Sequence, residues 1–172
     1  MMHLNKENYL PWKFISFLVI IVISVIVLLY SLLISPPPVQ EIKSELKLTK
    51  VNDSLLICDK SWLKKNSYNL WELYVEGSPY ERGIKTGMLT KNLMEYQEIA
   101  FLKQIIKLVP SSSYLDFLKY FIAIFNRNLD KNIPLENLQE MYGISKFMSN
   151  KFAFISPGYM RVLNYHAAHD IG

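Results

Sequence analysis

The sequence predicts an α+β body preceded by a single transmembrane helix. Three observations lead to this prediction. Residues 14–34 carry no charge, two short strand-like runs lie at residues 54–59 and 69–76, and apolar residues recur with helical spacing from Pro79 onward. A few strands followed by several helices are typical of an α+β arrangement rather than of alternating strand and helix units.

The uncharged run at residues 14–34 has the length of a membrane span. Its 21 residues would form a helix about 31 Å long, close to the hydrocarbon core of about 30 Å. A helix is the expected form because lipid leaves every backbone polar group to be paired internally. A secretory signal peptide has an apolar core about half as long, and the prolines at 36–38 give a poor cleavage context. We therefore expect an uncleaved signal anchor.

The charges on either side of this run favour one orientation. The N-terminal side has Lys6 and Lys13 against Glu7, whereas the far side begins with an uncharged proline-rich stretch and then mixes lysine with glutamate. The positive-inside rule then places residues 1–13 in the cytoplasm. The body is expected on the extracytoplasmic side of the cell membrane, in the periplasm or at the cell exterior.

The chain after the membrane run divides into a linker and a folded body. Residues 35–40 are proline-rich and predict a stiff, extended spacer, and the charged stretch at 41–50 leaves its structure open. In the body, residues 54–59 and 69–76 are expected to be two strands, with the polar residues 64–67 as the turn between them. Residues 35–50 thus form a linker, and residues 51–172 form the body.

Four helices are expected in the body. The first begins at Pro79 and runs to about Val109, and the second fits residues 114–128. The third begins near Pro134, with Gly143 as its end or a kink, and the fourth opens at Ser156 and Pro157. Two strands and these helices need more sheet than residues 51–172 supply, so we expect this domain to be incomplete, with a further segment or chain completing it.

Charge and cysteine content exclude some functions. The net charge is +4, but the part that begins at Val51 holds 14 Lys and Arg residues against 12 Asp and Glu residues, without a basic cluster that would indicate nucleic-acid binding. The single cysteine, Cys58, excludes an intrachain disulfide. Its apolar neighbours predict a buried strand position rather than a reactive thiol.

The start of the first body helix carries several signals. Gly77 supplies a turn, Ser78 and Glu81 have the spacing of a capping box, and Pro79 suits the first helical position. Gly83 and Gly87 then lie on one face of the helix, where each glycine costs about 1 kcal/mol relative to alanine. We expect close approach of another segment or a ligand to offset this cost, most simply through tight packing of the helix on the sheet.

Near Gly172 the sequence has one polar cluster with catalytic residue types. His166 and His169 are spaced to face the same way on a helix and to share a metal, and His169 with Asp170 resembles the His-Asp pair of HD-type metal phosphohydrolases. That family needs a further upstream histidine, which is missing between His3 and His166. A structural role in hydrogen bonding is the simpler interpretation, and we expect no cofactor and no metal. The cluster comprises Asn164, Tyr165, His166, His169 and Asp170.

Several runs together resemble the cysteine-dependent N-terminal-nucleophile acyltransferases, the C45 peptidase-like relatives of acyl-CoA:6-aminopenicillanic acid acyltransferase. They are LWELYVEG with GSPYERGIKTG, FNRNLD, EMYGIS and LNYHAAHDIG. The resemblance covers most of residues 54–172. The last three of these runs resemble the membrane-anchored bacterial branch of the family. It implies a four-layer α/β/β/α sandwich, self-cleavage before a cysteine, and acyl transfer or amide hydrolysis through a thioester. The α-amino group of that cysteine would serve as the base for its own thiol.

The resemblance implies particular roles for this chain. The nucleophilic cysteine is expected beyond Gly172, so no catalytic residue is assigned, and the acyl or amide substrate binds only when a C-terminal catalytic segment or chain completes the fold. The lipid bilayer is the other expected partner, through residues 14–34. A non-catalytic, membrane-tethered helical interaction module is the alternative. Motif residues expected to be packing determinants near the substrate side are Gly77, Pro79, Tyr80, Glu81, Gly83 and Gly87.

Overall fold

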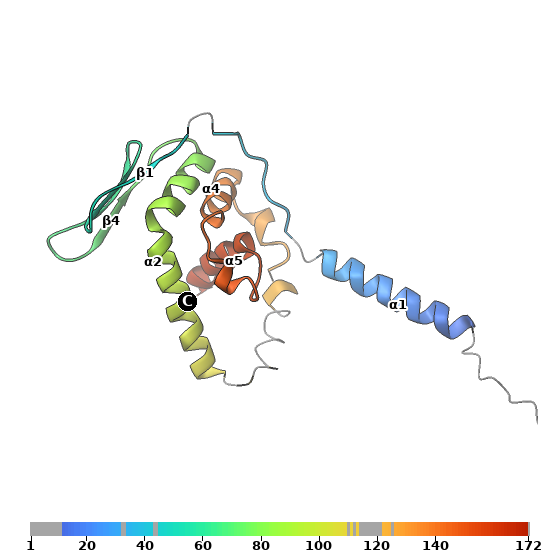
Figure 1. The fold of residues 1–172 in the computed structure, drawn as a ribbon. Coiled ribbons are helices and arrows are strands. Elements are labelled where there is room, and N and C mark those ends of the chain that lie inside the picture. The colour runs from blue at the N-terminus through green and yellow to red at the C-terminus, as the bar shows by residue number, and fades with distance from the viewer. Residues whose placement is uncertain are drawn as a thin grey trace, which may run out of the picture. The chain divides into compact units, whose positions relative to one another are not determined.

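The protein is described by a computed structural model that covers residues 12–31, 34–42, 45–109, 111, 113, 122–124 and 126–171, with the backbone alone for residues 30, 31 and 168–171. The chain forms two compact units, Met1–Leu33 and Ile34–Gly172. The first unit contains helix α1, Trp12–Ser31. The second unit, called the body below, contains a sheet and helices (Figure 1), so the α+β prediction is confirmed at this level.

Helix α1 is long and apolar enough to cross a membrane. Its window Trp12–Leu29 has a mean hydropathy of 2.8, and none of that window is buried. The described helix ends at Ser31, and Ile34 belongs to the body. Its length and composition make α1 a candidate membrane span.

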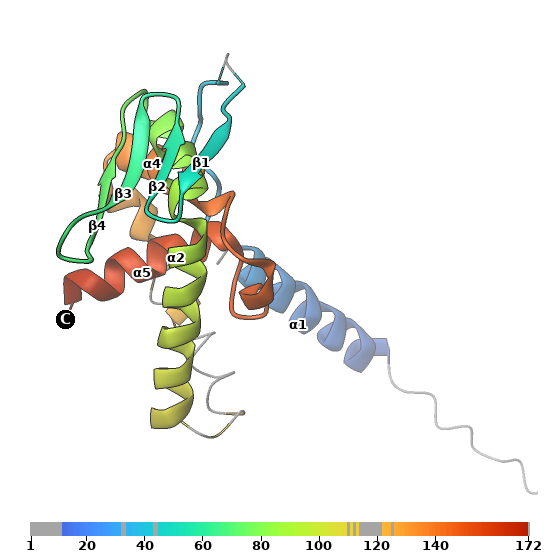
Figure 2. The ribbon, with the colours of Figure 1, turned by 60° about the vertical axis from the view of Figure 1, so that its left-hand side comes forward.

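The body contains a four-stranded antiparallel sheet instead of two strands. Its strands are β1 (Leu48–Asn52), β2 (Leu55–Cys58), β3 (Ser61–Lys65) and β4 (Trp71–Tyr74), in the order β1-β2-β3-β4 (Figure 2). The prediction placed the turn at residues 64–67, but Lys64 pairs with Glu72 and Lys65 with Trp71 inside the sheet. The chain reverses both at Asp59, whose φ of 54° fits a tight turn, and after Lys65, so the predicted turn is correct only for Asn66 and Ser67.

The turn between β3 and β4 is built by Asn66. Its side-chain oxygen accepts hydrogen bonds from the backbone N–H groups of Tyr68 (2.9 Å) and Leu70 (3.0 Å), and Asn69 has a φ of 68°. Asparagine side chains commonly stabilise turns in this way. These local bonds fix the register in which Leu63 faces Leu73.

Helix α2 (Pro79–Leu108) is the long helix of the body, and its bounds agree with the prediction to within a residue. It is followed along the chain by η1 (Leu129–Asn132), α4 (Leu135–Ser145), η2 (Asn150–Phe152) and α5 (Gly158–Ile171). The helix expected at residues 114–128 lies largely outside the described residues. Gly143 does not end the third helix, since α4 continues to Ser145.

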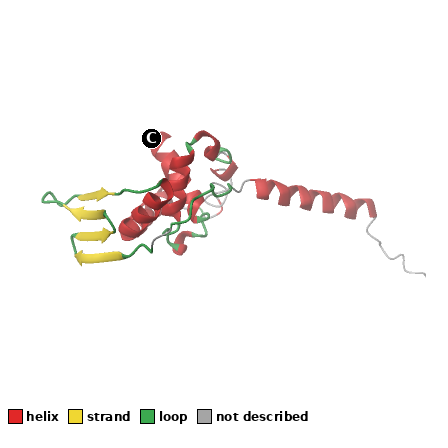
Figure 3. Ribbon diagram, turned by 90° about the horizontal axis from the view of Figure 1, so that it is seen from above, coloured by secondary structure: helices red, strands yellow, loops and turns green. Residues whose placement is uncertain are grey.

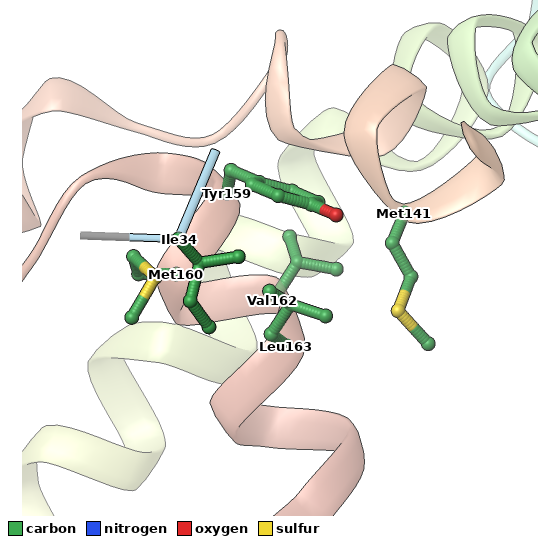
Figure 4. Close-up of a cluster of buried hydrophobic side chains, with 6 residues drawn as sticks. All are labelled: Ile34, Met141, Tyr159, Met160, Val162 and Leu163. Carbon is green, nitrogen blue, oxygen red and sulfur yellow. The ribbon is translucent and has the colours of Figure 1, made fainter. Parts of the chain in front are cut away.

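The core of the body has two clusters of buried apolar side chains. One joins α2 to the sheet through Cys58, Leu63 and Leu89. The other joins α4 and α5, and it includes Ile34 from the segment before β1 (Figure 4). Figure 3 shows the sheet beside the helices of the body.

Glycines allow α2 and α4 to pack backbone against backbone. A Cβ added at Gly83 would overlap the carbonyl oxygen of Glu140, and one added at Gly143 would lie 2.6 Å from the carbonyl oxygen of Tyr80. A Cβ at Gly87 would overlap the ring of Phe147. The close approach expected from the sequence is therefore present, but the partner is a helix and the segment after it, not the sheet.

We expect Gly83→Ala to lower the free energy of unfolding by about 3 kcal/mol. The new methyl group has no room at the α2–α4 crossing, and overpacking of this kind costs about 1–3 kcal/mol or more. That cost exceeds the gain of about 1 kcal/mol in helix propensity. The measurement is chemical denaturation of the full chain in detergent. Asn92→Ala, at an exposed position of the same helix, is the control and should change stability by less than about 0.5 kcal/mol; equal stability of the two variants would contradict the crossing.

Candidate functional site

A cluster of charged residues lies where the sheet meets the start of α2, and it includes two of the motif residues, Gly77 and Glu81. The β2–β3 turn contributes Asp59, the segment after β4 contributes Glu76 and Gly77, and the first two turns of α2 contribute Glu81 and Lys85. Gly77 has a φ of +129°, a conformation that glycine adopts without strain. Its turn redirects the chain from the sheet into the helix.

Lys85 is the centre of this site. It is 1 % exposed, and its ammonium nitrogen lies 2.9 Å from Asp59 Oδ2, 2.8 Å from Glu81 Oε1 and 3.1 Å from the Glu76 carbonyl oxygen. An ammonium group has three protons to donate. Each of them therefore has an acceptor, and the buried charge is balanced by two carboxylates.

The pKa values of Lys85 and Asp59 are both shifted in the direction that favours the ionised form. Burial alone would lower the pKa of Lys85, but Glu81 and Asp59 outweigh it and raise the pKa above the ordinary lysine value. The hydrogen bond from Lys85 is the main reason that the pKa of Asp59 is lowered. Because a lysine acts as a nucleophile only as the neutral amine, Lys85 is suited to fixing structure and not to covalent chemistry.

Cys58 lies beside this centre but is not a reactive thiol. It is fully buried, as the sequence predicts, and its Sγ lies 3.9 Å from the Sδ of Met88. Burial raises the pKa of the thiol, against a weaker opposing effect of Lys85. A thiol whose pKa is raised carries little thiolate at neutral pH, and the thiolate is the reactive form.

The predicted capping box is wrong in its side-chain contacts. Ser78 is the N-cap residue, but its side chain makes no capping hydrogen bond, and Glu81 is bonded to Lys85 instead. Pro79 occupies the first helical position as predicted. Buried charge at Lys85 explains the difference, because leaving it without a carboxylate would cost more than a missing cap.

The other motif residues pack α2 on α4. The Tyr80 ring stacks on Tyr142 with ring centres 5.9 Å apart. Arg82, between the motif positions, donates to Glu140 through Nε (3.1 Å) and Nη2 (2.9 Å) and to the carbonyl oxygen of Gly77 (3.3 Å). Gly77, Pro79, Tyr80, Glu81, Gly83 and Gly87 thus all have structural roles, while their nearness to a substrate stays a prediction.

A second buried charge cluster lies farther along α2, and sequence reasoning missed it. Arg161 of α5 is 2 % exposed and its Nε lies 2.9 Å from Oε1 of Glu98, which is 3 % exposed. Arg161 also donates to the carbonyl oxygens of Ser156 (3.0 Å) and Ser149 (2.7 Å). The sequence offered one signal for this cluster: Glu98 and Arg161 are charged residues at positions that face apolar neighbours.

Tyr165 completes this second cluster. Its hydroxyl donates to Glu98 Oε1 at 3.0 Å, and burial followed by the charge of Glu98 raises the pKa of Tyr165 well above its ordinary value. Burial also raises the pKa of Glu98, opposed by Arg161 and Tyr165. Tyr165 therefore stays a neutral hydrogen-bond donor, which joins α5 to α2.

The polar cluster expected around the histidines is not brought together as a site in the described residues. Asn164 accepts a hydrogen bond of 2.8 Å from the Nδ2 of Asn126, and the Nδ1 of His166 lies 2.9 Å from the carbonyl oxygen of Val162. His166 is exposed. The side chains of His169 and Asp170 lie outside the described residues. Where side chains are described, no group of three or more His, Cys, Asp or Glu residues could hold a metal ion.

No protein-family model, no curated protein and no solved structure matches this chain.

We expect Asp59→Asn to weaken the acid dependence of stability. The folded-state pKa of Asp59 is below its ordinary value of 3.8, so the stabilisation is present above pH 3.8 and is lost as the pH falls through the lowered value. The wild-type melting temperature should therefore drop more steeply below pH 4 than that of the variant. Asparagine keeps the positive φ of this turn. Glu136→Gln, an exposed change of equal charge, should melt in parallel with the wild type; a variant curve parallel to the wild type would refute the coupling.

We expect Glu98 and Arg161 to be energetically coupled. Removing one partner leaves a buried, unpaired charge, so Glu98→Gln and Arg161→Met should each lower the free energy of unfolding by about 3 kcal/mol. The double variant should lose about 2 kcal/mol less than the sum of the two. A double-mutant cycle measured by denaturation tests this, and additive losses would mean that the pair does not act as a unit.

Proposed function

We propose that this chain is the membrane-anchored N-terminal part of a cysteine-dependent acyltransferase or amidohydrolase. In this proposal α1 spans the cell membrane with residues 1–13 in the cytoplasm, and the body lies on the extracytoplasmic side. The body supplies the first strands and helices of an α/β/β/α sandwich. The nucleophilic cysteine comes from a further C-terminal segment or chain.

The observation that carries the proposal is one face of the sheet that none of the described body helices covers, called the bare face below. Side chains alternate across a strand, so Leu56, Cys58 and Leu63 face α2 while their neighbours face the opposite way. In Figure 1 the helices of the body all lie on one side of the sheet. An α/β/β/α sandwich would stack its second sheet on the other side.

One row of side chains on this bare face fits a sheet-packing surface. Ile57, Trp62 and Tyr74 are paired in register across β2, β3 and β4, and the rings of Trp62 and Tyr74 stack with centres 5.9 Å apart. Tyr74 remains 45 % exposed. A row of aromatic and branched side chains buries much apolar area when a second sheet covers it.

The buried groups at the start of α2 agree with a supporting role for this chain. Two nearby groups with nucleophilic atoms are Cys58, which is buried, and Lys85, which has its three protons bound. Neither is suited to attack a substrate. Acyl chemistry in the proposed enzyme therefore belongs to a different cysteine.

A second candidate function is a non-catalytic, membrane-tethered interaction module. The exposed apolar side chains along the distal half of α2, including Phe101 and Leu108, favour it. The two candidates differ in what completes the protein. The acyltransferase proposal requires a cysteine-bearing segment on the bare sheet face, whereas the module requires only a partner on the helices.

The experiment is to express the gene with its natural downstream sequence. We expect self-cleavage before a cysteine, a membrane-bound N-terminal fragment of the intact mass of this chain or longer, and hydrolysis of acyl amides or thioesters that stops on thiol alkylation. A coding sequence without a downstream or companion cysteine-bearing segment would exclude the acyltransferase proposal and leave the interaction module.

We expect Tyr74→Lys to block assembly with the catalytic segment. The added charge would be buried between the two sheets, so co-purification and activity should fall at least about 30-fold, while the stability of the separate chain changes by less than about 1 kcal/mol. Tyr68→Lys, at a turn position that is 82 % exposed, is the matched control and should retain assembly. Normal assembly of the Tyr74 variant would exclude a second sheet on this face.

A further inference from the structure

The segment that follows α1 is part of the folded body. Ile34 is 9 % exposed and belongs to the buried cluster formed by Met141 of α4 and four residues of α5. Figure 4 draws Ile34 among these side chains, which are Tyr159, Met160, Val162 and Leu163. The sequence predicts Ile34 to be the last residue of the membrane run, with a spacer after it, but Ile34 lies in the core of the body.

A second contact holds the same segment four residues later. The side-chain Nε2 of Gln139, on α4, donates to the carbonyl oxygen of Pro38 at 2.7 Å. The three prolines at 36–38 keep the backbone between the two contacts extended and lower the entropy lost on docking. Ile34 and Pro38 are thus fixed at the two ends of a stiff piece of chain.

The cluster that Ile34 joins is the one that holds α5 in place. Leu163 is 0 % and Val162 3 % exposed, and the half-buried residues packed around them come from α4 and the segments on either side of it. Removing a branched side chain from such a cluster leaves a cavity that close-packed neighbours fill only in part. The packing of α5 therefore depends on a residue that lies just after α1.

We propose that residues 34–38 form a strap that completes the α4–α5 core. The body therefore binds the strap by non-covalent packing as well as through the covalent chain. This packing is independent of the proposed function.

One consequence rests on the proposed membrane anchoring. A cut between the strap and β1 would leave the body attached to the membrane, and release of the body would require a cut before Ile34.

The experiment replaces residues 41–44 with a specific protease site in the full chain, purified in detergent. After complete cutting, we expect the fragment of residues 1–40 to co-elute with the fragment that begins at Glu45 on size exclusion. Ile34→Asp should separate the fragments, because it places a charge in the apolar cluster. Ser35→Asp puts the same charge at an exposed neighbouring position and should leave them together. Separation of the fragments with the natural strap would overturn the proposal.

Milder variants keep the test decisive if Ile34→Asp prevents folding. Ile34→Ala should lower the melting temperature of the uncut chain by about 5–10 °C, and Gln139→Ala should speed separation of the cut fragments about fivefold. If either variant behaves like the wild type, the proposed strap is wrong. Carbonate extraction of membranes tests α1 separately, so loss of the chain into the soluble fraction would refute the anchoring and leave the strap untouched.

Discussion

The contact between the backbones of α2 and α4 determines the arrangement of the body helices. Gly83 and Gly143 lie at the same crossing, and each would clash with the backbone of the other helix if it carried a side chain. At this short separation Arg82 reaches Glu140 and Tyr80 stacks on Tyr142. A glycine inside a helix costs about 1 kcal/mol, and the polar and aromatic contacts that the crossing permits offset that cost.

Two buried cations connect α2 to other parts of the body. Lys85 binds acceptors from the β2–β3 turn and the segment after β4, whereas Arg161 of α5 pairs with Glu98 and with two backbone carbonyls. A buried ion pair contributes little net stability over apolar packing, but breaking one is expensive. These clusters therefore act mainly to specify which segments meet α2, and at which residues.

The sequence predicted what is local and missed what depends on distant partners. Helix α2 was found to within a residue because Pro79 marks its start and its apolar periodicity is long, and the buried position of Cys58 followed from its apolar neighbours. The sheet was misjudged because Lys64 and Lys65 have turn-like polarity although they pair within a strand. The pairing of Lys85 with Asp59 and of Arg161 with Glu98 could not be found, since only the tertiary fold brings these groups near. Glu81 lies four residues before Lys85 on the same helix, but the sequence pattern assigned it to a capping box instead.

The two faces of the sheet differ in what they contact: one packs against α2, and the other presents aromatic side chains. Where the sheet packs against α2, Cys58 and Leu63 are almost fully buried, and Lys85 at the start of that helix has every proton bound. Neither Cys58 nor Lys85 is free to react. The opposite face presents Trp62 and Tyr74 in register, and a sheet with an aromatic row on one side gains most by covering it. If the chain takes part in acyl transfer, as proposed, its contribution is therefore to support a second sheet through this face, and the reacting groups lie on the partner.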